Sequence, residues 1–297
     1  MNTNKLTVGL VQHTCSGSGD DNLARTASGI RDAAAKGAKL VVCQELHTSL
    51  YFCQTEDTIN FDLAETIPGP SSDALGKLAK ELGIVIVASL FEQRAARVYH
   101  NTAVVLDSDG KIAGKYRKMH IPEDPGYYEK FYFTPGDLGF TPIQTSLGKI
   151  GVLVCWDQWF PEAARLMTLA GADILCYPTA IGWVPEDPDD EKQRQLNAWQ
   201  TIQRAHAIAN GVPVIACNRT GHEDDPSGHS SGIDFWGNSF IAGPQGEFIV
   251  QADANSESVL TAEIDFKHCE NTRRIWPFLR DRRIDSYNKI NQRMIDE

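Results

Sequence analysis

The chain has 297 residues, of which 42% are hydrophobic and 23% charged, and its formal net charge is −11. These values are typical of a soluble globular protein, and a chain of this length buries about 75% of its unfolded surface, so a large core needs no disulfide or metal. The acidic balance argues against a nucleic-acid partner, and no apolar run approaches the roughly 20 residues that span a bilayer.

The cysteines and the N-terminus indicate a reducing compartment. Seven cysteines, an odd number without framework spacing, are expected to be reduced thiols. Residues 1–5 lack the apolar segment of a signal peptide. There is no C-x-x-C or H-E-x-x-H motif, and the eight histidines are scattered. We therefore expect a cytoplasmic protein that holds no metal and no other cofactor.

Strand and helix patterns alternate along the first half of the chain. Gly37 and Gly83 each follow a helical segment, which is the usual position for a glycine that ends a helix. The predicted elements are a strand at 6–12, a helix at 22–36, a strand at 40–43, a helix from 71–73 to 82, a strand at 84–89, and a hairpin of 98–106 with 111–115.

The second half repeats the alternation. Gly37-Ala38-Lys39 and Gly171-Ala172-Asp173 each precede a buried strand, so the same unit is used in both halves. The predicted elements are a strand at 147–154, a helix at 160–170, a strand at 174–177, a helix at 190–210, a strand at 214–217, and a hairpin through 243–246. We expect an α/β layered fold with two similar halves in one domain, 1–297, a pattern that a doubly wound sheet would also give.

Cys155 lies where a buried strand turns into a helix. A thiol at the carboxyl end of a strand faces the crevice where open α/β sheets bind ligands, with backbone N–H groups nearby to stabilise an oxyanion. Cysteine is a strong nucleophile in that position, although many strand-end cysteines are simply part of a core.

Two charged residues also follow predicted strands. Glu45 follows the strand at 40–43, and Lys118 follows the hairpin. Taken singly, each is more readily explained as one of the 67 charged side chains on a solvated surface. Together with Cys155, however, they supply the groups that thiol amide hydrolysis needs. The carboxylate takes the thiol proton and later activates water. The ammonium stabilises the tetrahedral intermediate and favours the thiolate.

The order Glu45, Lys118, Cys155, within Gln-Glu-Leu, Tyr-Arg-Lys and Val-Cys-Trp-Asp, resembles the nitrilase superfamily of carbon–nitrogen hydrolases. The resemblance covers about residues 5–287 and is nearest to members that act on a carbamoylated diamine. It implies an α-β-β-α sandwich with the active site between the halves, and a homodimer or higher homo-oligomer. Further matching blocks lie at 51–54, 120–122, 125–133, 155–165, 177–182, 237–244 and 278–283.

The resemblance also implies a second glutamate that supports the lysine, and Glu129 matches it. Members that act on carbamoylated amino acids carry an arginine shortly after the cysteine, whereas this chain has no basic side chain there before Arg165. An anionic substrate is therefore disfavoured, because an unpaired buried carboxylate would be costly, whereas a neutral or cationic tail would fit. The resemblance implies a cationic small-molecule substrate. Expected substrate-binding residues are acids for the ammonium and aromatic or N–H groups for the rest: Asp124, Glu186, Asp187, Tyr51, Trp156 and Trp183.

The sequence thus predicts a hydrolase that uses Cys155, Glu45, Lys118 and Glu129 to cleave a carbamoylated diamine to the diamine, carbon dioxide and ammonia. Another amidase or carbamoyl hydrolase of the same fold is the alternative enzyme. A catalytically silent scaffold is the alternative from a different class. A papain-like protease is disfavoured because only His120 flanks these motifs.

Overall fold

The computed structural model describes residues 4–295, so residues 1–3, on which part of the expectation about the N-terminus rests, lie outside the described chain. Two six-stranded sheets and one three-stranded sheet form the framework. The first sheet has the order β15 (Ser258–Asp265), β1 (Lys5–Gln12), β2 (Leu40–Cys43), β3 (Val85–Ala95), β4 (Val98–Leu106) and β5 (Ile112–Arg117). The second has the order β14 (Phe248–Gln251), β13 (Phe240–Ala242), β10 (Val214–Cys217), β8 (Ile174–Pro178), β7 (Lys149–Val152) and β6 (Ile143–Gln144). The small sheet has the order β11 (Thr220–Glu223), β12 (Ile233–Trp236) and β9 (Gly182–Trp183).

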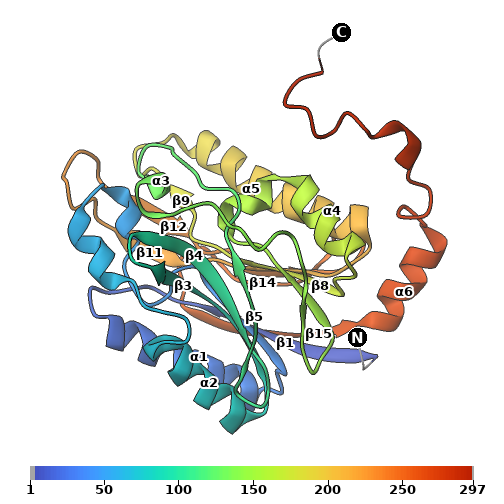
Figure 1. Cartoon of the computed structure of the whole chain (residues 1–297), viewed down its shortest axis with the longest axis horizontal. Coiled ribbons are helices and arrows are strands. Elements are labelled where there is room, and N and C mark those ends of the chain that lie inside the picture. The colour runs from blue at the N-terminus through green and yellow to red at the C-terminus, as the bar shows by residue number, and fades with distance from the viewer. Residues whose placement is uncertain (1–3, 296–297) are drawn as a thin grey trace.

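Helices cover the outer face of each large sheet (Figure 1). On the first sheet, Ile30 and Leu78 pack into one buried cluster with Val41 and Ile86. The helices are α1 (Gly19–Ala35), α2 (Pro70–Leu82), the short α3 (Glu129–Tyr132), α4 (Pro161–Leu169), α5 (Asp189–Asn210) and α6 (Phe266–Ile275), with 3-10 turns η1 (Phe52–Gln54), η2 (Thr58–Leu63), η3 (Cys155–Trp159) and η4 (Ile284–Ser286).

The two large sheets face each other across the main core. Val8, Leu10 and Val42 of the first sheet belong to the same buried cluster as Ile150 and Ile215 of the second. A direct link crosses between them, because the Cys217 thiol donates to the backbone carbonyl of Val11 at 3.2 Å. The layers are therefore helix, sheet, sheet, helix, which confirms the α-β-β-α arrangement and excludes a single doubly wound sheet.

The central strands of both sheets run parallel, which gathers their carboxyl ends at one edge. β1, β2 and β3 are parallel neighbours in one sheet, as are β7, β8 and β10 in the other. The segments that leave β2 and β8 meet there, because the Glu45 N–H donates to the Thr179 carbonyl at 3.2 Å. The segment that carries Glu45 therefore lies at the seam between the halves, beside the segment that follows β8.

Several predicted elements differ from the structure at their ends. The predicted strand at 147–154 is shorter, since β7 covers Lys149–Val152, and β15 was not predicted at all. β15 lies at the sheet edge and pairs with β1, more than 240 residues earlier in the chain. In the described part of the chain, no helix is long and apolar enough to cross a membrane.

Candidate active site

Glu45 follows β2 and is fully buried. Its Oε1 atom accepts hydrogen bonds from the Asn101 amide at 2.7 Å and from Lys118 Nζ at 2.8 Å. In the described residues no group donates to Oε2, although that atom is buried. A buried carboxylate oxygen without a donor is costly, so this oxygen is available to accept a proton.

Lys118 follows β5 and lies between two carboxylates. Its Nζ donates to Glu45 Oε1 at 2.8 Å and to Glu129 Oε2 at 2.6 Å, and all three side chains are fully buried. Burial by itself would lower the pKa of Lys118, but the charges of Glu129 and Glu45 outweigh it and hold that pKa well above its usual value. The site thus holds a permanent ammonium.

Glu129 begins the short helix α3, at the end of the loop that follows Lys118. Its Oε1 accepts a hydrogen bond from the Tyr51 hydroxyl at 2.7 Å, while Oε2 binds Lys118. Burial raises the pKa of Glu129 to about 7, against the opposing charge of Lys118. Tyr51 thereby orients the carboxylate that orients the lysine.

Cys155 is the first residue of η3 and has a backbone φ of +41°, in the left-handed region. A non-glycine residue in this region is strained and persists only when its surroundings hold it. Its thiol donates to the carbonyl of Ala180 at 3.7 Å. Burial, reinforced by the charge of Glu45, raises the pKa of the Cys155 thiol well above its usual value, although Lys118 opposes this. The resting sulfur is therefore a protonated thiol that needs a base, rather than the thiolate that the sequence analysis expected Lys118 to favour.

Asp157 holds the nucleophile turn in place and is fully buried. Its Oδ2 accepts from the Val154 N–H at 2.9 Å and from the Tyr116 hydroxyl at 2.8 Å. Its Oδ1 accepts from the backbone N–H of His120 at 3.0 Å. One carboxylate therefore connects the residue before Cys155 with the segment that carries Lys118.

A cavity of about 420 Å³ opens onto Cys155 and Glu129. Its walls include the predicted binding residues Trp156, Asp124 and Asp187. Asp187 is half-buried and accepts from the Gln195 amide at 3.0 Å, whereas Asp124 is exposed. No lysine or arginine is among the described residues that line it: Pro122, Asp124, Pro125, Tyr127, Glu129, Cys155, Trp156, Trp159, Ala180, Ile181, Gly182, Val184, Asp187, Gln195, Ala198 and Trp236.

Three predicted binding residues do not line this cavity. Glu186 is exposed and hydrogen-bonds the Ser231 hydroxyl instead. The Trp183 indole donates to the Lys192 carbonyl at 2.9 Å, and its ring packs on Trp236. Tyr51 donates its hydroxyl hydrogen bond to Glu129, so Tyr51 supports that carboxylate and does not line the cavity.

The structure also brings to the site residues that were not predicted from the sequence. Asn101, on β4, binds Glu45, and Gln195, on α5, binds Asp187. Tyr127 and Trp236 complete the cavity wall. Asn101 carried no distinct signal in the sequence, because it lies in a short polar run with His100 and Thr102 within β4.

Comparisons with known proteins point the same way as the geometry. The carbon–nitrogen hydrolase family matches residues 7–274. An N-carbamoylputrescine amidase from Arabidopsis thaliana is 46% identical over 288 residues, which cover 96% of this chain and 95% of that protein. A citrullinase from Francisella tularensis is 42% identical over 284 residues, which cover 95% of this chain and 97% of that protein. The crystal structure of a carbon–nitrogen hydrolase from Helicobacter pylori G27 is 55% identical, with a TM-score of 0.95, and covers 98% of this chain and 100% of that one.

Proposed function

Because the chain belongs to the carbon–nitrogen hydrolase family, we propose that it hydrolyses N-carbamoylputrescine to putrescine, carbon dioxide and ammonia. Membership makes it an enzyme that hydrolyses carbon–nitrogen bonds. The observation that carries the mechanism is the buried ion-paired group of Glu45, Lys118 and Glu129, together with a cavity that Glu129 and Cys155 line. The observation that carries the substrate is that the same cavity presents carboxylates and no basic side chain among the described residues.

In the first step, Glu45 Oε2 takes the thiol proton while Cys155 Sγ attacks the ureido carbonyl carbon. Lys118 Nζ and the Trp156 N–H stabilise the resulting oxyanion. The intermediate collapses when its carbon–nitrogen bond breaks, and Glu45 returns the proton to the departing nitrogen, which leaves as an amine or as ammonia. The carbonyl carbon is now bonded to sulfur.

In the second step, Glu45 takes a proton from water, and the oxygen of that water attacks the carbonyl carbon on sulfur. The carbon–sulfur bond breaks, and the proton returns to the thiol. The product that leaves the sulfur is a carbamic acid, and its loss of carbon dioxide breaks the remaining carbon–nitrogen bond. Together the two steps consume one water and release putrescine, carbon dioxide and ammonia. Glu129 keeps Lys118 charged and oriented through both steps, because it holds Nζ at 2.6 Å.

Asp187 is the residue that we propose receives the distal ammonium of the substrate. It lines the cavity and is half-buried, and Gln195 fixes its carboxylate. A charge-assisted hydrogen bond contributes roughly 1.5–3 kcal/mol. Such a bond corresponds to about 10- to 150-fold in kcat/KM when it is kept in the transition state.

Citrulline is the second candidate substrate, because a citrullinase is 42% identical to the chain. Citrulline also carries a carbamoyl group and an ammonium, but it adds a carboxylate. The cavity offers that carboxylate no lysine or arginine among its described lining residues, so we expect citrulline to be the poorer substrate.

The test is ammonia release from N-carbamoylputrescine, citrulline, carbamoyl-β-alanine and the uncharged N-butylurea. N-carbamoylputrescine should exceed N-butylurea about 10- to 150-fold in kcat/KM and the two carboxylates by more. Asp187→Asn should remove the preference while N-butylurea turnover persists, and Asp189→Asn, a nearby exposed acid, should leave it unchanged. Equal or better turnover of a carboxylate substrate would contradict the diamine assignment and leave the hydrolase assignment standing.

Iodoacetamide separates the hydrolase from a silent scaffold on the same fold. A working site should alkylate the Cys155 peptide far faster than the peptides of the other six cysteines, and Cys155→Ala should remove both this labelling and the ammonia release. Uniform slow labelling of all seven cysteines would favour the scaffold.

We also propose that the chain forms a homo-oligomer. Residues 276–295 extend away from the body (Figure 1), and many of their large apolar side chains are exposed, among them Phe278, Ile284 and Ile290. A second copy that covers them would make a homodimer or a larger homo-oligomer. We also propose a cytoplasmic location, which the seven free cysteines support.

A further inference from the structure

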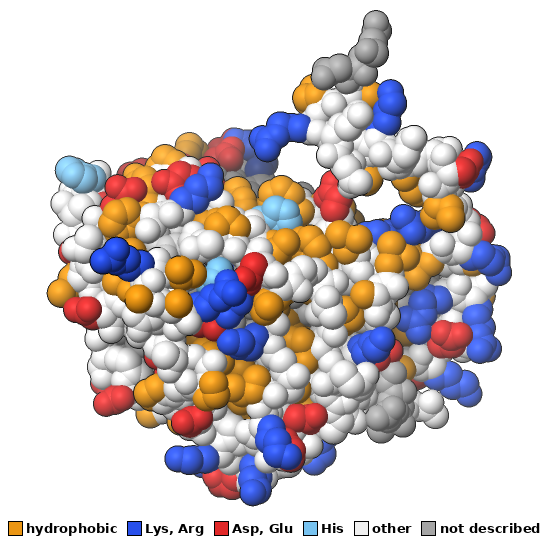
Figure 2. Space-filling view, viewed as in Figure 1, with side chains coloured by type: hydrophobic (Ala, Val, Ile, Leu, Met, Phe, Trp, Pro, Cys, Tyr) orange, Lys and Arg blue, Asp and Glu red, His pale blue; other side chains and the backbone are white. Residues whose placement is uncertain are grey.

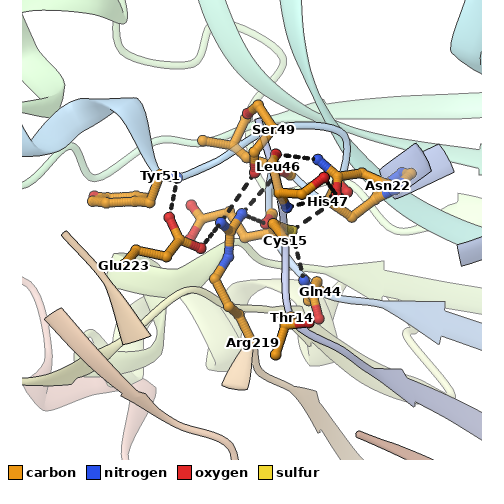
Figure 3. A network of polar contacts seen from close by, with 12 residues as sticks. Thr14, Cys15, Asn22, Gln44, Leu46, His47, Ser49, Tyr51, Arg219 and Glu223 are labelled. Carbon is orange, nitrogen blue, oxygen red and sulfur yellow. Dashed lines mark hydrogen bonds and ion pairs between the residues drawn. The ribbon is translucent and has the colours of Figure 1, made fainter. Parts of the chain in front are cut away.

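Arg219 follows β10 in the second half of the chain, yet its side chain binds the loop that carries Glu45 in the first half (Figure 3). Its Nη2 donates to the backbone carbonyls of Glu45 at 3.0 Å and Leu46 at 2.9 Å. Its Nη1 donates to the backbone carbonyl of Ser49 at 3.0 Å. The side chain is fully buried and does not line the cavity, so it does not itself meet substrate.

Glu223, at the end of β11, joins Arg219 to a second part of the same loop (Figure 3). One carboxylate oxygen accepts from Arg219 Nη1 at 2.6 Å, and the other accepts from the Tyr51 backbone N–H at 2.6 Å. The hydroxyl of Tyr51 in turn binds Glu129, which holds Lys118. Two paths of hydrogen bonds therefore start from the buried ion pair of Arg219 and Glu223. One path reaches the backbone of Glu45, and the other reaches Lys118 through Tyr51 and Glu129.

The loop itself needs this support. Leu46 has a φ of +47°, a conformation that a leucine adopts only when its surroundings impose it. A buried ion pair is often no better for stability than apolar residues of the same size, so stability alone gives a weak reason for placing one here. The planar guanidinium matches the task, because it can donate to three carbonyls and one carboxylate in fixed directions, which a lysine ammonium cannot do.

We propose that Arg219 and Glu223 are positioning residues that set the place of Glu45 relative to Cys155 and, through Tyr51, that of Glu129 and Lys118. The inference rests on the proposed thiol mechanism and deepens it. An ion pair in the second half of the molecule would then hold catalytic side chains of the first half in position. Misplacing a catalytic group by about 1 Å can cost about 100-fold in rate, so loss of the pair should be visible in the chemistry.

The test is the alkylation rate of Cys155 by iodoacetamide in four proteins: the unaltered chain, Arg219→Lys, Glu45→Gln and the double variant. If Arg219 acts through Glu45, Arg219→Lys should slow alkylation about 10- to 100-fold when Glu45 is present. It should slow alkylation less than about twofold in the Glu45→Gln background, where the base is already lost. Arg204→Lys is the matched control, since Arg204 also donates to a backbone carbonyl, that of Gly246, but contacts no part of the site.

Each outcome decides the proposal. The same slowing in both backgrounds would show a general structural effect and overturn it, as would an unchanged rate in Arg219→Lys. If thermal melts show that Arg219→Lys does not fold, Glu223→Gln replaces it and is measured with and without Glu45→Gln. Tyr51→Phe is likewise measured with and without Glu129→Gln. In each case the first substitution should slow alkylation only when its partner residue is intact. Unselective labelling of the unaltered chain would instead contradict the proposed function, so the two failures are distinguishable.

Discussion

At the scale of single residues, the site is governed by burial of ionisable groups. Glu45, Lys118 and Glu129 are all fully buried, so their charges act on one another with little screening by water. Burial raises the pKa of Cys155 and of Glu129, while the two carboxylates keep Lys118 charged. The raised pKa leaves the thiol neutral at rest, and in the proposed mechanism Glu45 takes its proton before it attacks.

Glu129 gives a prediction about pH. Its pKa of about 7 means that it becomes protonated as the pH falls through neutrality, and Lys118 then keeps only one charged partner. We expect kcat to decline as the pH falls through about 7, and Glu129→Gln, which resembles the protonated form, to have a lower kcat without this decline. A pH–rate profile between pH 5.5 and 8.5 measures both. An acid limb that persists in Glu129→Gln would assign the ionisation to another group.

The raised pKa of Glu129 also determines how the free energy of unfolding changes with pH. A carboxyl whose pKa is raised from 4.5 to about 7 binds its proton more tightly in the folded chain than in the unfolded chain. Its contribution to the free energy of unfolding is full below about pH 4.5 and is lost as the pH rises through about 7. Urea denaturation between pH 4.5 and 7 should therefore show a less negative slope of unfolding free energy with pH for Glu129→Gln than for the unaltered chain.

At the scale of elements, the site is built where parallel strands end. β2, β5 and β7 deliver Glu45, Lys118 and the nucleophile turn to one edge. Asp157 then fastens the turn, because it binds the Val154 N–H, the Tyr116 hydroxyl and the His120 N–H. The strained backbone of Cys155 depends on these bonds.

Asp157→Asn tests this role. The asparagine side chain has one accepting oxygen, and its NH2 group cannot accept a hydrogen bond. Donors that now bind the second carboxylate oxygen of Asp157 would therefore lose their acceptor, at a cost of about 1–3 kcal/mol in the free energy of unfolding. Urea denaturation measures that loss, and kcat should fall as well because the turn carries the nucleophile. Asp281→Asn, an exposed acid, serves as the control. Unchanged stability and kcat in Asp157→Asn would remove Asp157 from this role.

At the scale of the whole molecule, two sheets and their helices enclose the site, while residues 276–295 stand apart from the body. Figure 2 shows apolar side chains scattered among basic and acidic ones along this segment. Trp276 and Phe278 are 43% and 44% exposed, and Met294 is 74% exposed, which is more apolar surface than a segment in water usually presents. Such a segment is suited to cover a second copy of the chain.

The corresponding prediction concerns assembly. The full chain should scatter light as a dimer or larger particle at micromolar concentration, and a chain ended after Ile275 should form smaller particles while retaining its circular dichroism. The physical reason is that truncation removes the apolar surface that a second copy would bury. Light scattering that finds only a 32.8 kDa species for the full chain would contradict the proposed assembly.

The sequence by itself determined the alternation of helices and strands and the identity of the residues that follow β2, β5 and β7. Apolar periodicity fixes which segments are buried, and a polar residue after a buried strand marks its end. Glu45, Lys118 and Cys155 could therefore be recognised as candidates from the chain alone, but only the family resemblance selected them as a set and added Glu129. The packing of two separate sheets could not, because one alternating pattern fits several layered folds.

Only the tertiary structure decided which side chains of the loops face the site. Glu186 and Asp187 are adjacent acids, yet Glu186 turns to Ser231 and Asp187 turns to the cavity. Arg219 binds Glu45 and Leu46 across more than 170 residues of chain. Spacing along the chain sets local geometry, whereas contacts between distant loops depend on how the two halves pack, so no local pattern in the sequence could have revealed them.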